Sequence, residues 1–144
     1  IRMSILVLAW LAGSRRRPKK SPPHIAKMNS HAILSLFHIL LVAPFFFYVG
    51  FQRAANPAAI YYVLLGLGLL LVIYHSYKAF ARYRTNSPYI WVNLLHAAII
   101  GPLLLYIGAN GRDTPRAAYE LLLIAAFGVF GYHMYSLIVS MNTE

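Results

Sequence analysis

The sequence repeats itself at an interval of 58 residues, and this repeat constrains the fold more than any other feature of the chain. From His31 onward, residues match those 58 positions later mainly at histidine, proline, glycine and tyrosine. Chance matches in an apolar chain would fall first on leucine and alanine. The informative pairs are His38/His96, Pro44/Pro102, Gly50/Gly108, Pro57/Pro115, Tyr61/Tyr119, Tyr74/Tyr132, His75/His133 and Tyr77/Tyr135. A fixed period of this kind indicates a duplicated structural unit.

The composition places the duplicated unit in a membrane. Apolar residues make up 60% of the chain and charged residues only 11%, whereas a soluble domain carries about 25% charged residues. Crossing about 30 Å of hydrocarbon takes roughly 20 helical residues, and four segments are long enough: 31–52, 57–82, 89–109 and 115–140. We therefore expect an all-α integral membrane protein, a compact four-transmembrane-helix bundle made of two tandem helical hairpins. Because each repeat holds two spans, both hairpins enter the bilayer in the same direction, as parallel repeats.

The chain divides into three parts by this reasoning. Residues 28–86 form the first hairpin repeat, residues 87–144 form the second, and residues 1–27 form a basic extension. This extension is either interfacial or not native, because Met28 stands directly before the first repeat and translation beginning there is one hypothesis. Basic residues beside apolar spans are typical of contacts with lipid headgroups, so we expect the lipid bilayer as partner and no nucleic acid. The charge of the extension also favours cytoplasmic termini.

The duplicated histidines are the candidate functional residues. Helical rise places His38 and His75 at similar depth in antiparallel spans, near the face that bears both termini, and the repeat places His96 and His133 at the same level. The four histidines are therefore predicted to form one intramembrane layer, in two related pairs. Four tyrosines accompany them as possible hydrogen-bond partners: Tyr74, Tyr77, Tyr132 and Tyr135.

Several interpretations of this layer stay open. Imidazole ligates metals, and two imidazoles can hold haem iron inside a helical bundle, so haem b or a transition metal is one candidate ligand. The histidines can also relay protons, or only bridge neighbouring helices by hydrogen bonds. The chain is thus expected to be a non-enzymatic membrane protein with a polar histidine site. The alternatives are a structural or assembly protein and an ion channel formed by oligomers, and a homo-oligomer or a larger membrane assembly fits all of these.

Other residues in the spans receive structural interpretations. Pro44 and Pro102 fall within their spans and are predicted to bend them. Glu120 lies four residues after Arg116 and is expected to form an ion pair with it. Tyrosines toward the span ends, including Tyr61 and Tyr119, are expected to anchor the chain at the membrane surface. The glycines of the second span of each repeat (Gly66, Gly68, Gly128 and Gly131) are expected to permit close helix packing.

The sequence from Met28 onward resembles a known group of proteins. The stretches MNSHAILSLFHILLVAPFFFYVG, WVNLLHAAIIGPLLLYIG, GRDTPRAAYELLL and GYHMYSLI are similar to small four-span membrane proteins encoded by large DNA viruses of marine algae and protists. The resemblance covers residues 28–144 and implies a viral protein of the virion's internal membrane or of a host membrane. It implies no activity and no ligand residues. Residues 1–27 depart from it.

Overall fold

The computed structural model describes residues 30–142, which are helical apart from short connections and contain no strand. The predicted basic extension, residues 1–27, lies outside the described residues. In chain order the elements are α2 (Ser30–Phe37), η1 (His38–Val42), α3 (Ala43–Gln52), η2 (Arg53–Ala55), α4 (Ala58–Arg84), α5 (Ile90–Leu95), η3 (His96–Ile100), α6 (Gly101–Asn110), η4 (Gly111–Asp113) and α7 (Arg116–Asn142).

These elements join into four long helical rods. Their limits are Ser30–Ala55, Ala58–Arg84, Ile90–Asp113 and Arg116–Met141, and each is long and apolar enough to cross a membrane. The predicted all-helical class with four apolar spans is confirmed on length and composition. The limits lie within a few residues of those predicted.

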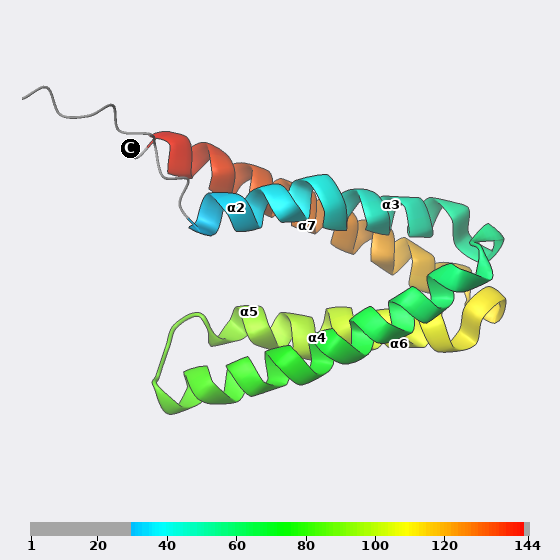
Figure 1. Cartoon of the computed structure of the whole chain (residues 1–144), viewed down its shortest axis with the longest axis horizontal. Helices are drawn as coiled ribbons and strands as arrows, with labels where there is room; N and C mark the ends of the chain where they lie inside the picture. Colours follow the sequence, from blue (N-terminus) through cyan, green and yellow to red (C-terminus); the bar gives the residue numbers. More distant parts are fainter. Residues whose placement is uncertain (1–29, 143–144) are drawn as a thin grey trace, which may run out of the picture.

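The four rods are arranged as two arms rather than as one compact bundle (Figure 1). One arm consists of the first rod (α2, η1 and α3) packed on α7, and the other consists of α4 packed on the third rod (α5, η3 and α6). Each rod therefore has its main neighbour in the other predicted hairpin. The sequence could not reveal this pairing, because the repeat gives the order of the rods but not which faces meet.

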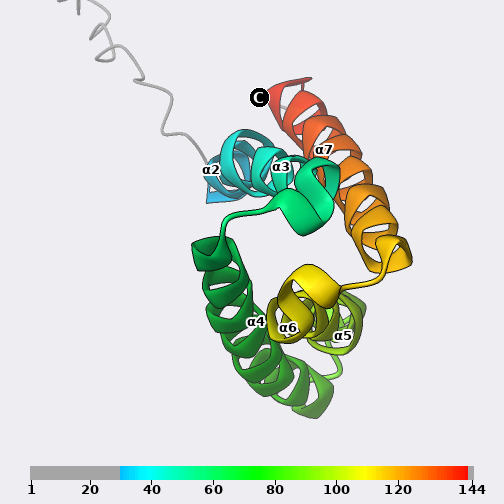
Figure 2. The same cartoon turned by 90° about the vertical axis from the view of Figure 1, so that its right-hand side faces the viewer.

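The arms converge at one end and separate toward the other (Figures 1 and 2). At the closed end, the turns η2 and η4 touch, and the core lies just below them. This core draws side chains from all four rods: Phe46, Val49, Tyr61, Leu64, Leu104, Ile107, Ala118, Tyr119, Leu122 and Ala126. At the other end, α2 packs on α7 and α5 packs on α4, with no comparable packing between the arms in the described chain.

Buried polar groups organise the two turns at the closed end. The amide of Asn56 donates hydrogen bonds to the carbonyl oxygens of Val49 (2.9 Å) and Arg53 (2.7 Å). The hydroxyl of Thr114, 58 residues later, bonds the carbonyl oxygens of Ile107 (3.2 Å) and Gly111 (2.7 Å). Both side chains thus satisfy carbonyls that the end of a helix leaves without a partner, and they close the two turns in the same way.

Tyr61 and Tyr119 lie in the core, so the prediction that they anchor the chain at the membrane surface is wrong. They are only 6% and 1% exposed. Their hydroxyls lie 3.4 Å apart, and each also reaches a turn carbonyl, that of Arg53 for Tyr61 (3.3 Å) and that of Gly111 for Tyr119 (3.2 Å). A buried phenol needs a hydrogen-bond partner, and here the two arms supply it to each other.

Candidate functional site

The four predicted histidines form two stacked pairs, one in each arm. His38 of η1 stacks on His133 of α7 with ring centroids 4.1 Å apart and an angle of 19° between the planes. His96 of η3 stacks on His75 of α4 at 4.4 Å and 18°. Each pair joins a residue of the first repeat to one of the second, whereas hairpin packing would have paired residues of the same repeat.

The protonated nitrogen of His38 and His96 is fixed by backbone hydrogen bonds. Nδ1 of His38 lies 2.8 Å from the carbonyl oxygen of Leu34, and Nδ1 of His96 lies 2.7 Å from that of Val92. Because a carbonyl oxygen only accepts, Nδ1 carries the proton in both rings. In the neutral imidazole, Nε2 then keeps a lone pair that can bind a metal or a proton.

Their stacking partners are held by small polar side chains that the sequence reasoning missed. Nδ1 of His75 donates to Oδ1 of Asn93 at 3.0 Å, and Nδ1 of His133 lies 3.4 Å from Oγ of Ser35. Asn93 and Ser35 are 4% and 2% exposed. They occupy matching positions 58 residues apart, but they are different residue types, so a search for identities passes over them. A polar residue at the same place in two apolar spans was the available signal.

A change in helix type at the histidines sets their position. The π-helical turns His38–Val42 and His96–Ile100 each begin at the histidine. The amide of Ala43 bonds the carbonyl oxygen of His38, and the amide of Gly101 bonds that of His96, which are bonds to the fifth residue back. Pro44 and Pro102 follow directly, and proline has no amide proton to donate. The wider turn accommodates the predicted break in the hydrogen-bond ladder, and π-helical turns of this kind are frequent at functional sites.

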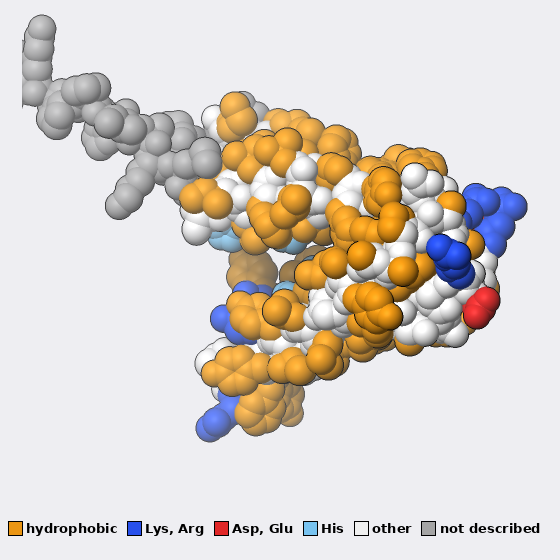
Figure 3. Space-filling view, turned by 45° about the vertical axis from the view of Figure 1, so that its right-hand side comes forward, with side chains coloured by type: hydrophobic (Ala, Val, Ile, Leu, Met, Phe, Trp, Pro, Cys, Tyr) orange, Lys and Arg blue, Asp and Glu red, His pale blue; other side chains and the backbone are white. Residues whose placement is uncertain are grey.

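The histidine pairs border the open space between the arms. All four rings are half-buried, and Figure 3 shows histidine side chains at the edge of the hollow that separates the arms. The apolar core at the closed end lies between this space and the turns η2 and η4. The site is therefore open on one side and sealed toward the other end of the rods.

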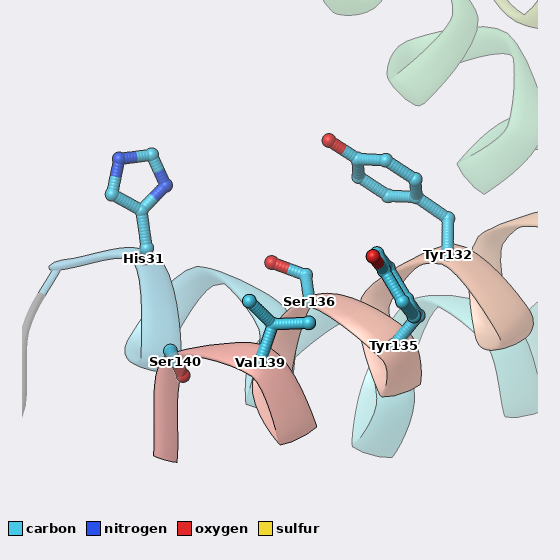
Figure 4. Close-up of a pocket in the computed structure, with 6 residues that line it drawn as sticks. All are labelled: His31, Tyr132, Tyr135, Ser136, Val139 and Ser140. Carbon is cyan, nitrogen blue, oxygen red and sulfur yellow. The ribbon is translucent and has the colours of Figure 1, made fainter. Parts of the chain in front are cut away.

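The four tyrosines predicted to support the histidines do not bond them through their hydroxyls. Tyr74 and Tyr132 stand edge-on to the neighbouring rings of His75 and His133, with centroids 5.1 Å apart in both cases. Tyr132 and Tyr135 also line an open groove of about 300 Å³ with Ser136, Val139 and Ser140 of α7. His31 of α2 completes it, and Figure 4 shows His31, Ser136 and Tyr132 pointing to the same side. Tyr74 and Tyr77 lie on an exposed face of α4.

The donor atoms of the site limit its chemistry. Within residues 30–142, no group of three or more His, Cys, Asp or Glu side chains is placed to hold a metal ion. Of the two described acids, Asp113 belongs to the turn η4, and Glu120 forms the predicted ion pair with Arg116 on the surface of α7. The imidazole nitrogens of the two histidine pairs are therefore the donor atoms that this site offers.

Comparisons with protein-family models, with curated proteins and with solved structures found no match to this chain.

Proposed function

We propose that this chain is a non-enzymatic integral membrane protein that binds haem between its two arms, where Nε2 of His38 and Nε2 of His96 would hold the iron. The observation that carries the proposal is the hydrogen bond from Nδ1 of each ring to a backbone carbonyl. Histidines that ligate metals commonly donate their other ring N–H in this way, which fixes the ring and leaves Nε2 free.

The arrangement of the two rings also supports a flat ligand. His38 and His96 belong to opposite arms, so a flat group between the arms could be held by one imidazole from each arm. Bis-imidazole haem would need only these two protein ligands. Bound haem would supply a one-electron redox centre. The protein's own part is to orient the ligand nitrogens and to surround the group with apolar side chains.

The stacked partners complete the proposed site. His133 covers a face of the His38 ring and His75 covers a face of the His96 ring. Ser35 and Asn93 hold these partners in place. The rings of His133 and His75 therefore limit the rotation of the His38 and His96 rings without occupying Nε2 of either.

The test is an absorption spectrum of the detergent-purified protein, expressed with haem available, in the oxidised and the dithionite-reduced state. We expect a Soret band and sharp α and β bands on reduction, and their loss in the double variant His38→Ala/His96→Ala. His31→Ala is the matched control, since His31 is exposed and belongs to neither pair. A colourless wild-type protein, or a double variant that keeps its bands, contradicts the proposal.

A structural role is the second candidate, and a specific observation favours it. Nδ1 of His75 meets Asn93 and Nδ1 of His133 meets Ser35, and these contacts join the two rods of each arm without any ligand. This role predicts a colourless protein that loses thermal stability in Asn93→Leu, because that change leaves the half-buried His75 without its partner. Equal stability of Asn93→Leu and wild type would argue against it.

The remaining alternative is an ion channel formed by oligomers. The side chains of Val49, Leu64, Leu104, Ile107 and Leu122 are fully buried at the closed end and leave no polar path between the histidines and that end. An oligomeric pore would have to run between chains, and planar-bilayer conductance is the measurement that tests it.

The membrane and the orientation of the chain are part of the proposal. The resemblance to viral four-span proteins supports a viral internal membrane or a host membrane, and the charge of residues 1–27 supports cytoplasmic termini. The chain has no cysteine, so single cysteines introduced at Ala54 and at Thr85 report on opposite ends of the rods. Labelling with a membrane-impermeant thiol reagent from the cytoplasmic side should reach Thr85→Cys and not Ala54→Cys. The reverse pattern would contradict the proposed orientation.

A further inference from the structure

The two turns at the closed end share a backbone conformation that suits glycine. The first residue of η2, Arg53, has φ 51° and ψ −129°, and the first residue of η4, Gly111, has φ 57° and ψ −128°. Glycine adopts this conformation freely, whereas any other residue is strained there. The backbone therefore does not explain the arginine at position 53. A function of the arginine side chain would explain it.

The Arg53 side chain has an unmet donor. Its Nε is buried and forms no hydrogen bond in the described chain, and leaving a buried charged donor unpaired is unfavourable. The nearby carbonyl of Arg53 is taken by Asn56 and Tyr61. The one buried acceptor left over in the turn, Oδ1 of Asn56, makes no hydrogen bond to this Nε in the described chain. Arg53 is only partly buried, so a ligand from outside can reach the rest of its guanidinium.

Arg112 supplies a second cation at the same place. It belongs to η4, which contacts η2, and it is exposed. The neighbouring Arg116 is already paired with Glu120, and in the described residues this is the only ion pair. Asp113 thus neutralises neither Arg53 nor Arg112 by direct contact.

We propose that the turns η2 and η4 bind a phosphate group of a membrane lipid, with Arg53 as the main ligand and Arg112 as the second cation. A planar guanidinium fits phosphate oxygens with two parallel hydrogen bonds. Both turns lie at the ends of helices that are long enough to span a bilayer, which is the level of the lipid headgroups. The lipid phosphate would accept hydrogen bonds from the accessible part of the Arg53 guanidinium and offset the strained backbone. This proposal is independent of the haem site, which lies toward the opposite end of the rods.

The decisive variant is Arg53→Gly, because it removes the guanidinium while giving position 53 the residue that its partner turn already uses. The measurement is thermal unfolding of the full chain in a maltoside detergent, without addition and with phosphatidylglycerol, diacylglycerol or inorganic phosphate. We expect phosphatidylglycerol to raise the wild-type melting temperature by several degrees and diacylglycerol, which lacks the phosphate, to leave it unchanged. Arg53→Gly should lose most of that rise.

Two further variants complete the test. Arg84→Gln removes a cation at the far end of α4 and should keep the full response to phosphatidylglycerol. Arg53→Gln is a second neutral variant, since it removes the charge but keeps a long polar side chain at position 53. An equal rise in wild type and both Arg53 variants would overturn the proposal. A rise of the same size with inorganic phosphate would support the phosphate chemistry but overturn its assignment to a lipid.

Discussion

At the scale of single residues, the buried hydroxyl pair of Tyr61 and Tyr119 shows how closely the arms depend on each other. Each phenol has one proton, yet three contacts compete for the two protons: one between the hydroxyls and one to each turn carbonyl. At any moment, one hydroxyl can donate to the other only by giving up its own carbonyl. Both turn carbonyls also accept from Asn56 or Thr114, so neither is left without a donor.

This arrangement predicts that the effects of replacing the two tyrosines on the free energy of unfolding are not additive. Tyr61→Phe or Tyr119→Phe alone should lower the free energy of unfolding by about 1 kcal/mol, because the remaining hydroxyl still bonds its carbonyl. The double variant should lose less than the sum of the two, since each single change already removes the shared contact. Chemical or thermal unfolding in detergent measures these differences, with Tyr62→Phe as an exposed control. Strict additivity would show that the 3.4 Å contact contributes nothing.

Arg53 gives a second prediction at this scale, on stability without any lipid. In phosphate-free detergent, Arg53→Gly should raise the free energy of unfolding by about 1 kcal/mol, because the strained φ of 51° becomes relaxed. The reverse change, Gly111→Ala, should lower it by a similar amount, since its φ of 57° disfavours any side chain. Both effects are read from melting curves. A lower stability of Arg53→Gly would mean that the arginine side chain stabilises the turn directly.

At the scale of helices, glycine determines how closely α4 packs on the third rod. A Cβ atom on Gly108 would lie 2.8 Å from the backbone nitrogen of Leu65, and one on Gly68 would lie 2.8 Å from that of Leu105. Gly68 therefore has the packing role that the sequence predicted for the glycines of α4 and α7. For Gly66, Gly128 and Gly131 that prediction is wrong, because an added Cβ would meet nothing within 4 Å.

The contrast provides a matched pair of variants. Gly108→Ala should destabilise the protein by about 1–3 kcal/mol, because backbone atoms cannot move aside as a flexible side chain can. Gly66→Ala should be neutral or slightly stabilising, since alanine favours the helix and the position is open. Melting temperatures of the two variants, measured side by side, check the difference. Equal losses would show that α4 and α6 do not pack as closely as described.

The sequence predicted the rods better than their packing. Hydropathy and turn signals located the four spans. The rise per residue of an α-helix predicted that the four histidines lie in the same region. The i, i+4 spacing of Arg116 and Glu120 also predicted their ion pair correctly. The pairing across repeats was not predictable, because spans that are apolar all round carry no marked face. Ser35 and Asn93 show the same limit, since only the structure reveals that each meets a histidine of another rod.

At the scale of the whole molecule, packing is concentrated at one end. The buried core joins all four rods near η2 and η4, while the histidine pairs each belong to a single arm. The arms are thus joined firmly at the closed end and only loosely at the open end. This distribution suits a site that admits a ligand from one side.

The uneven packing predicts a difference in mobility between the ends. Spin labels at Ala54 and Arg112, on the touching turns, should give a narrow distance distribution by pulsed electron resonance. Labels at the exposed Tyr77 and Tyr135, on opposite arms near the histidines, should give a broader one. The absence of cysteine from the chain makes both label pairs free of background. Distributions of equal width would contradict the two-arm description.

The crossed histidine pairs have a consequence for how such a protein can be assembled. Each half of the chain contributes one histidine to each of the two stacks. One hairpin alone therefore cannot form a stack, whereas two hairpins together form both. Two separate, identical hairpins would form a symmetric dimer, and its two stacks would be identical. Joining the halves in one chain removes this symmetry requirement. The two repeats accordingly differ at matching positions: Ser35 corresponds to Asn93, Arg53 to Gly111 and Tyr62 to Glu120. Covalent linkage thus allows one protein to have two sites of the same geometry whose surrounding residues can differ.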